Sequence, residues 1–287
     1  MADAIISGLI LGGLYSLIAI GLNLQFGVAK VLNLTHGEII ILFSLITYTL
    51  YNVLQISPLI SILFISIVAF VLGLAINKLL FQKLQIRSKS EESLTSSTLL
   101  VSFGFAFIIQ NISLIIWGGD LKSYMYLASP VNLLGATYSL NRVVVFCVAT
   151  GLCLLIYIYL KRSLFGKAIR AASADIIGAQ VIGINIRKVH AISFALGTSI
   201  AAIGGVLISM MIATDASAGM PYTIMALIII IIGGAGNFLG CLFAGFLVGI
   251  AEGIGGFLLG PGLRLVVNYG LLVLILLIRP QGIFGGK

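Results

Sequence analysis

Long apolar runs follow one another along nearly the whole chain, and short polar segments separate them. Each run approaches the ~20 residues that a helix needs to cross a hydrocarbon core of ~30 Å. The runs are apolar throughout and do not alternate with period two, which excludes a porin-like barrel. The pattern predicts an all-α, polytopic transmembrane helix bundle of about eight or nine spans, with residues 1–287 forming a single domain.

The bounds of the apolar runs give a provisional list of spans, of which the shortest leave room for partial crossings. The expected spans are Ala4–Leu22, Gly37–Tyr51, Pro58–Leu79, Leu94–Trp117, Val143–Leu160, His190–Ala213, Pro221–Ile232, Gly240–Leu259 and Leu265–Ile278.

The composition of the chain supports a membrane protein. The chain is 60% hydrophobic and 8% charged with a mean hydropathy of +1.22, whereas soluble domains carry about 25% charged residues. The three cysteines, Cys147, Cys153 and Cys241, lie inside apolar runs without metal-binding spacing. We therefore expect an integral membrane protein with no metal site and no catalytic residue.

Basic residues gather on one side of the expected spans. When the spans alternate in direction, Lys122, Arg142 and Arg264 fall on one side. The thirteen others fall opposite: Lys30, Lys78, Lys83, Arg87, Lys89, Lys161, Arg162, Lys167, Arg170, Arg187, Lys188, Arg279 and Lys287. The positive-inside rule then places the N-terminus outside and the C-terminus in the cytoplasm, although an error of one span would move the N-terminus. The net charge of +8 is thus assigned to membrane orientation and not to nucleic acid.

Two segments, NLQFGVAKVLNLTHGE (residues 23–38) and IIGGAGNFLG (residues 231–240), interrupt the apolar pattern with polar residues and glycine. Backbone that breaks inside a membrane is tolerated only where it is buried in protein or lines a cavity. In transporters, glycine-interrupted segments in the two halves point to the binding site. The candidates near a translocation path are Asn33, His36, Gly37, Glu38, Gly233, Gly234, Gly236, Asn237 and, within a later span, Glu252.

The role of the ionisable candidates stays open at this point. Ionisable groups within spans are costly and are functional by default, which favours contact with a transported solute. A buried structural network around His36, Glu38 or Glu252 is the competing interpretation. Asn237 has a separate expected role as the N-cap of the helix that follows it.

Small residues repeat at four-residue spacing in two spans, as Gly8-x-x-x-Gly12 and as Gly245-x-x-x-Gly249-x-x-x-Gly253. Such spacing lets helix backbones approach closely in lipid, which favours packing within the bundle or against a partner subunit.

The longest polar segment on the cytoplasmic side covers residues 161–189. With the histidine that follows, it reads KRSLFGKAIRAASADIIGAQVIGINIRKVH. Its composition predicts one helix over Ala168–Val181 with Gly183 as a C-terminal stop. The helix is rich in small residues and lacks the bulky apolar face of an interfacial lipid helix. Docking against a protein partner is therefore expected.

This segment, GKAIRAASADIIGAQVIGINIRKV, resembles the coupling motif of ABC importer permeases of the branched-chain amino-acid group. The opening GLILGGLYSLIAIGLNLQFGVAKVLNLTHGE and the late blocks GGAGNFLGCLFAGFLVGIAEG and LLIRPQGIFG resemble the two ends of the same family. The resemblance spans nearly the whole chain, and its length and start are similar to those of the smaller permease subunit type. It implies that ATPase coupling falls on Gly166, Lys167, Arg170, Ala171, Asp175, Ala179, Gly183 and Ile184.

Two positions depart from the family pattern. Gly178 stands where an alanine is usual, which should weaken the helix by roughly 0.5–1 kcal/mol, and Lys167 replaces an arginine with charge kept.

No P-loop is present in the sequence, so the resemblance implies a non-enzymatic chain without its own cofactor, in the inner membrane of a bacterium. Its expected partners are cytoplasmic ATPase subunits that bind ATP and Mg²⁺, a second permease subunit (a related chain or a second copy) and an extracytoplasmic binding protein. Branched-chain amino acids are the expected cargo, with other amino acids, urea and amides left open. The competing classes are an ion-gradient-driven transporter or channel, with Glu38 and Glu252 as coupling acids, and a scaffold subunit.

Overall fold

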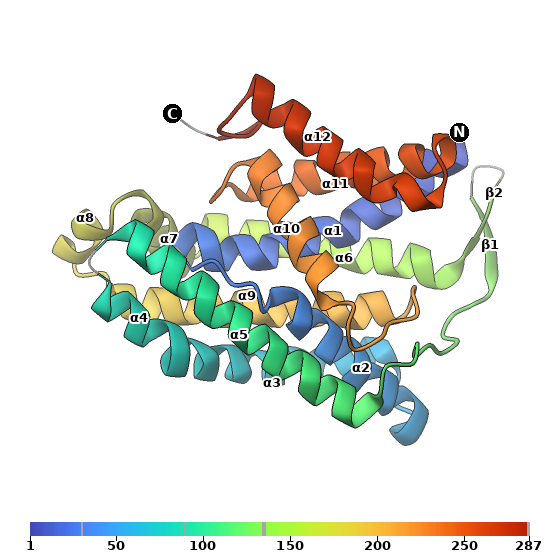
Figure 1. Ribbon diagram of the computed structural model, residues 1–287, viewed down its shortest axis with the longest axis horizontal. Helices are drawn as coiled ribbons and strands as arrows, with labels where there is room; N and C mark the ends of the chain where they lie inside the picture. Colours follow the sequence, from blue (N-terminus) through green and yellow to red (C-terminus); the bar gives the residue numbers. More distant parts are fainter. Residues whose placement is uncertain (30, 89, 134–135, 286–287) are drawn as a thin grey trace.

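The computed structural model describes the chain except for residues 30, 89, 134–135 and 286–287. Helices form almost all of it (Figure 1). They are α1 (Ala2–Ala29), α2 (His36–Leu54), α3 (Pro58–Ile76), the π turn η1 (Asn77–Phe81), α4 (Gln82–Arg87), α5 (Glu91–Trp117), α6 (Leu140–Arg162), α7 (Leu164–Ala174), α8 (Ile176–Val181), α9 (Ile186–Ser209), α10 (Gly219–Gly233), α11 (Phe238–Leu258), the 3₁₀ turn η2 (Pro261–Leu263) and α12 (Arg264–Ile278).

The helices confirm the predicted bundle. Seven are long and apolar enough to cross a membrane, and α10 and α12, with 15 residues each, are shorter apolar helices. Each expected span corresponds to one of these nine elements within the described ranges. A hairpin of β1 (Pro130–Leu133) and β2 (Ala136–Ser139) joins α5 to α6. The apolar pattern did not predict this hairpin, because it lies in a loop outside the spans.

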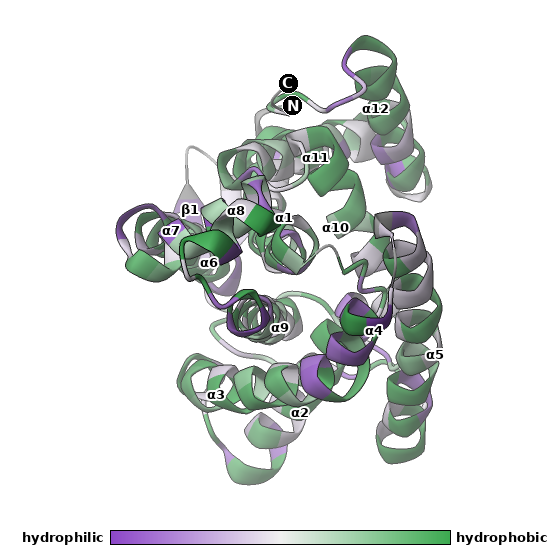
Figure 2. Ribbon diagram, turned by 90° about the vertical axis from the view of Figure 1, so that its left-hand side faces the viewer, coloured by the Kyte–Doolittle hydropathy of each residue, from purple (hydrophilic) through white to green (hydrophobic). Residues whose placement is uncertain are grey.

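Two helices occupy the centre of the bundle. Within the most apolar 18-residue stretch of α1 and of α9, 72% of the stretch is buried inside the bundle, compared with 22% in α5 and α6. Figure 2, which looks along the bundle from one end, shows α1 and α9 surrounded by the other helices. Side chains and backbone groups of α1 therefore meet several other helices, which bears on the polar contacts described below.

The predicted glycine repeats pack against each other. A Cβ atom added at Gly8 would lie 2.5 Å from the carbonyl oxygen of Gly249, and one at Gly249 would lie 2.4 Å from the backbone nitrogen of Gly12. A Cβ at Gly253 would lie 2.3 Å from the carbonyl oxygen of Ala4. Because small residues permit this approach, the repeats fix the packing of α1 on α11 inside one chain.

The basic residues separate between the two ends of the bundle. Lys122, Arg142 and Arg264 belong to the end with the hairpin, at the right of Figure 1. The opposite end carries α4, α7 and α8, with Lys78, Lys83, Arg87, Lys161, Arg162, Lys167, Arg170, Arg187, Lys188 and Arg279 at or near it. Lys30, Lys89 and Lys287 of the predicted set lie outside the described residues. By the positive-inside rule the α7–α8 end is cytoplasmic and the hairpin end is outside.

Candidate functional site

The first interruption is shorter than the sequence suggests. The pattern predicted a broken segment from residue 23, but α1 continues as a helix to Ala29. Asn23 and Gln25 remain helical, and the side chain of each forms a hydrogen bond to another element. The Asn23 Oδ1 atom accepts a hydrogen bond from the Gly236 N–H at 2.8 Å, and Gln25 Nε2 donates to Thr198 Oγ1 at 3.2 Å. The described break is confined to residues 31–35.

After this break the chain turns back into the bundle. Asn33 Nδ2 donates to Gln25 Oε1 at 2.8 Å, and His36 Nε2 lies 3.1 Å from the Ile18 carbonyl oxygen. Ile18 precedes the end of α1 by 11 residues, a helical rise of about 16 Å. Since the hydrocarbon core is ~30 Å thick, α2 begins near mid-membrane depth.

A second helix begins at the same place. The Gly37 N–H donates to Thr223 Oγ1 of α10 at 2.8 Å, and the Thr223 hydroxyl donates to the Leu34 carbonyl oxygen at 3.1 Å. A Cβ atom added at Gly37 would lie 1.9 Å from the carbonyl oxygen of Gly219, the first residue of α10. The N-terminal ends of α2 and α10 therefore meet inside the bundle. We call this meeting point, residues 34–38 with residues 219–223, the half-helix junction.

Glu38 lies at the half-helix junction, and its carboxylate has no hydrogen-bonding partner among the described residues. It is 5% exposed, and a Cβ atom added at Gly219 would lie 2.3 Å from its carboxylate carbon. No hydrogen bond or ion pair joins this carboxylate to another residue in the described part of the chain. Helix N-termini carry a partial positive charge and stabilise anions. The two converging N-termini thus hold a carboxylate whose hydrogen-bonding capacity is unused.

His36 has a different role. It is fully buried, and a carbonyl oxygen can only accept a hydrogen bond, so the Nε2 atom beside Ile18 must carry the proton. The Nδ1 atom has no partner among the described residues. The ring therefore attaches the first residue of α2 to the middle of α1, which is a structural contact.

Glu252 is also buried, at 8% exposed, but it is hydrogen-bonded. Asn268 Nδ2 of α12 donates to one carboxylate oxygen at 2.9 Å, and the Tyr15 hydroxyl of α1 donates to the other at 3.3 Å. The carboxylate connects three helices, α1, α11 and α12. This geometry matches the structural network that the sequence left as an alternative.

The second interruption exists but lies near the cytoplasmic end. Gly234 and Gly236 have φ angles of +92° and +85°, which end α10, and Asn237 Oδ1 accepts the Gly240 N–H at 2.9 Å, which confirms the predicted N-cap of α11. Asn237 Nδ2 donates to the Phe284 carbonyl oxygen at 3.0 Å. A Cβ at Gly233 would lie 2.5 Å from the carbonyl carbon of Gly240. The segment is therefore a compact connection held by the C-terminal residues.

The mid-membrane counterpart of the first break is the start of α10, which the sequence did not assign. Gly219 and Thr223 were missed as candidates. The shortness of the expected span Pro221–Ile232 was the available signal, since a run of this length cannot cross the core. Pro221, in the first turn of α10, was a second signal for a helix start.

The cytoplasmic segment contains two helices, and the single helix predicted over Ala168–Val181 is wrong. The α7 helix ends at Ala174, and Asp175 caps α8 by accepting the Ile177 N–H at 2.9 Å. An aspartate prefers this capping position to a helix interior. The predicted stop is confirmed: Gly183 has φ +86°, its N–H donates to the Gln180 carbonyl at 2.9 Å, and the next N–H donates to the Ala179 carbonyl at 3.0 Å, as in a Schellman motif.

Two coupling-motif residues attach α7 to the end of α6. The Arg170 guanidinium donates to the carbonyl oxygens of Leu160 and Lys161. A Cβ atom added at Gly166 would lie 1.9 Å from the same Leu160 oxygen. These carbonyls belong to the last turn of α6 and lack intrahelical donors. Arg170 and Gly166 therefore position the cytoplasmic segment, residues 161–189, which we call the coupling segment after the motif that it resembles.

The remaining coupling residues differ in exposure. Ala179 is buried, Ala171 and Ile184 are partly buried, and Lys167, Asp175 and Gly183 are exposed. Beside them, four large apolar side chains of the segment are 73–82% exposed at an end of the bundle that carries many charges. We call them the cytoplasmic apolar patch: Leu164, Ile177, Val181 and Ile182.

The half-helix junction and the coupling segment occur in a chain whose residues 4–276 match the family model of the permease component of the branched-chain amino acid transport system. The chain belongs to this family. The permease is 29% identical to the high-affinity branched-chain amino acid transport system permease protein BraD of Pseudomonas aeruginosa, over 98% of this chain and 94% of that protein. It is 26% identical to the corresponding LivH protein of Escherichia coli K12, over 97% and 94% of the two chains.

The fold of the permease is also similar to that of a chain in the solved structure of PsaBC from Streptococcus pneumoniae in complex with Fab. The TM-score is 0.51 and the identity 14%, over 98% of this chain and 92% of that one. With its candidate spans, the permease is a multi-pass protein of the bacterial inner membrane and a membrane-spanning transport subunit.

Proposed function

We propose that the permease carries branched-chain amino acids through a path that passes the half-helix junction, driven by ATPase subunits at its cytoplasmic end. The observation that carries this proposal is the unpartnered Glu38 carboxylate where the N-termini of α2 and α10 meet. Broken helices whose ends meet at mid-membrane depth are typical of substrate sites in transporters.

The chemistry of the half-helix junction suits a zwitterion. Exposed N–H groups at a helix N-terminus favour a carboxylate, and Glu38 offers a negative charge to an ammonium group. Because Gly37 and Gly219 carry no side chain, the two helix starts approach closely and the Glu38 carboxylate lies against the backbone of Gly219. In this proposal Asn33, His36 and Glu252 hold the helices in place, and the connection that contains Gly233, Gly234, Gly236 and Asn237 lies at the inner mouth of the path.

The cytoplasmic apolar patch is the proposed contact for an ATPase subunit that binds ATP and Mg²⁺. Large exposed apolar side chains of this kind mark protein interaction sites. Arg170 and Gly166 transmit force because they fix α7 to α6, so a displacement of α8 moves the bundle. A second permease subunit, as a copy or a related chain, and an extracytoplasmic binding protein at the hairpin end complete the proposed importer.

Reconstitution tests this proposal. The permease would be purified with its ATPase subunits and second permease subunit, placed in proteoliposomes and supplied with binding protein and labelled leucine. We expect uptake that requires ATP and is insensitive to collapse of the proton and sodium gradients. Uptake that follows an ion gradient without ATP would replace the importer with an ion-driven carrier in which Glu38 is the coupling acid.

A matched pair of variants tests the patch. Val181→Asp places a charge at the proposed interface, whereas Met125→Asp places one on an equally exposed side chain, 86% against 81%, at the opposite end. We expect co-purification of the ATPase to be lost in the first variant and kept in the second. Equal retention in both would exclude the patch as the docking surface.

A further inference from the structure

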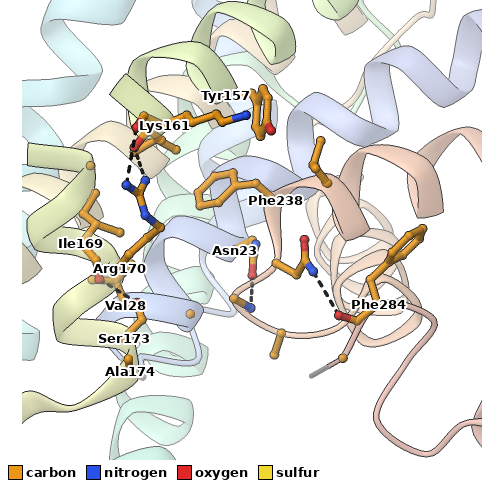
Figure 3. Close-up of a pocket in the computed structure, with 18 residues that line it drawn as sticks. Asn23, Val28, Tyr157, Lys161, Ile169, Arg170, Ser173, Ala174, Phe238 and Phe284 are labelled. Atoms are coloured by element: carbon orange, nitrogen blue, oxygen red, sulfur yellow. Dashed lines mark hydrogen bonds between the residues drawn. The ribbon is translucent and has the colours of Figure 1, made fainter. Parts of the chain in front are cut away.

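A cavity of about 820 Å³ opens at the cytoplasmic end between α6 and α7 on one side and the α10–α11 connection on the other (Figure 3). It brings together Gly166 and Arg170 of the coupling segment with Gly236 and Asn237 of the second interruption. The described lining includes two cations, Lys161 and Arg170, and no aspartate or glutamate. The cavity therefore has a net positive charge.

Neither of these two cations has an acidic partner in the part of the chain that the structure describes. Within the described ranges, the one ion pair within 4.0 Å joins Lys122 to Asp120 at the other end of the molecule. The Lys161 Nζ atom lies 5.6 Å from the centre of the Tyr157 ring, and Arg170 donates to carbonyl oxygens. Rings and carbonyls orient these groups but leave their charge uncompensated.

The opposite wall provides hydrogen-bond donors. It contains the start of α11, where the side chain of Asn237 caps Gly240 and the first backbone N–H groups lack intrahelical acceptors. Asn23, which is 1% exposed, also lines the cavity. Its Oδ1 atom accepts from Gly236, while its Nδ2 donor has no acceptor among the described residues. A buried donor without a partner is energetically unfavourable, so this amide points independently to a missing acceptor.

We propose that this cavity binds the phosphate of an anionic phospholipid of the inner leaflet. A phosphate offers several acceptor oxygens to two cations and to the donors of α11. A zwitterionic amino acid fits poorly, because no described lining residue offers a carboxylate to its ammonium group. A lipid is favoured over a soluble phosphate because the cavity lies at the cytoplasmic membrane boundary and has apolar walls that include Val28, Ile169 and Phe238. Basic pockets between helices on this side of a membrane bind such headgroups.

The bound headgroup would connect two parts of the cytoplasmic end. Lys161 lies at the end of α6 and Arg170 on α7, and Asn237 is the N-cap of α11. A phosphate between them ties the coupling segment to the α10–α11 connection, independently of the solute that is transported.

The test measures lipid binding by the assembled complex. The complex in phosphatidylcholine nanodiscs is titrated with fluorescent phosphatidylglycerol, for the native chain, Lys161→Gln and the control Lys83→Gln. Lys83 is exposed on α4 at the same end of the bundle and does not line the cavity. We expect about fivefold weaker binding for Lys161→Gln, from the loss of one basic contact, and native binding for the control.

Ser173→Asp, which adds an acid to the cavity wall, provides a second variant with the same expected loss if Lys161→Gln does not assemble. Equal affinity in the cavity variants and the control would overturn the proposal. Competition by inorganic phosphate or glycerol 1-phosphate at concentrations near those of the lipid would overturn the assignment to a lipid. If the lipid-binding test is negative, ATP-driven uptake is still expected in the reconstituted complex, so the two proposals are tested separately.

Discussion

Glu38 and Glu252 are two buried acids inside apolar helices, yet their surroundings differ. Glu252 receives hydrogen bonds from Asn268 and Tyr15 and connects three helices. Glu38 touches the backbone of Gly219 and has no hydrogen bond or ion pair within the described residues. Burial alone therefore does not separate a structural acid from a functional one. The partners of the carboxylate make the distinction.

The backbone around the two acids also differs. Glu252 lies within the continuous helix α11, whereas Glu38 lies in the first turn of α2, where α10 also begins. A satisfied acid in a continuous helix stabilises the bundle. An unsatisfied acid between two helix ends remains available to a ligand.

The largest expected effect is on transport. Glu38→Gln should lower leucine uptake per assembled complex at least tenfold. The variant removes the charged acceptor proposed for the ammonium group of the solute, and a hydrogen bond to a charged group contributes about 1.5–3 kcal/mol. Complex assembly should persist. Glu252→Gln serves as the control and should retain uptake within a few-fold of native. Similar losses in both variants would remove the distinction between the two acids.

Gly37→Ala tests the close approach of α2 to α10. Its Cβ atom would lie 1.9 Å from the Gly219 carbonyl oxygen, and overpacking of this kind costs about 1–3 kcal/mol. We expect a lower melting temperature for the purified complex together with loss of uptake. A stable, active variant would show that the helix ends do not meet as described.

Glu252→Leu tests the structural network. Tyr15 and Asn268 would lose their acceptor, and each unsatisfied buried donor costs about 1–3 kcal/mol. We expect lower thermal stability with uptake per folded complex retained. Adding Asn268→Leu should recover part of the loss, and the double-mutant cycle gives the coupling energy. Additive losses would contradict a direct contact.

The smallest effect is expected at Gly151, in the middle of α6, where a new Cβ atom would meet nothing within 4 Å. Gly151→Ala should stabilise the protein by about 0.4–1 kcal/mol by restricting the unfolded chain. Measured beside Gly37→Ala, it separates backbone entropy from close packing. Destabilisation at Gly151 would show that another surface covers this position.

The sequence predicted much of this architecture because apolar length and charge bias act locally. The nine apolar elements, the basic end, the close-packing glycine repeats, the Asn237 cap and the stop at Gly183 all follow from neighbouring residues in the sequence, whereas the pairing of α1 with α11 was not predicted. The family also followed from the sequence, since four motif blocks appear in the right order.

The half-helix junction could not be predicted in the same way. Gly219 and Thr223 contact residues 34–37 across more than 180 positions of the chain, and no local pattern reports such a contact. Asn23 and Gln25 resembled a break because their partners, Gly236 and Thr198, are also distant in sequence. The division of the coupling segment at Asp175 was missed because helix propensity outweighed a capping residue.

The most direct test of the central claim is the accessibility of position 38. Glu38→Cys and Glu252→Cys would be made in a Cys147→Ser background, since Cys153 and Cys241 are buried. The assembled transporter would be treated with a membrane-impermeant thiol reagent, without nucleotide and with ATP and vanadate. We predict labelling at position 38 in at least one state, protection of that position by leucine, and no labelling at position 252. An unlabelled position 38 in every state, in a complex that assembles normally, would contradict a path past the half-helix junction.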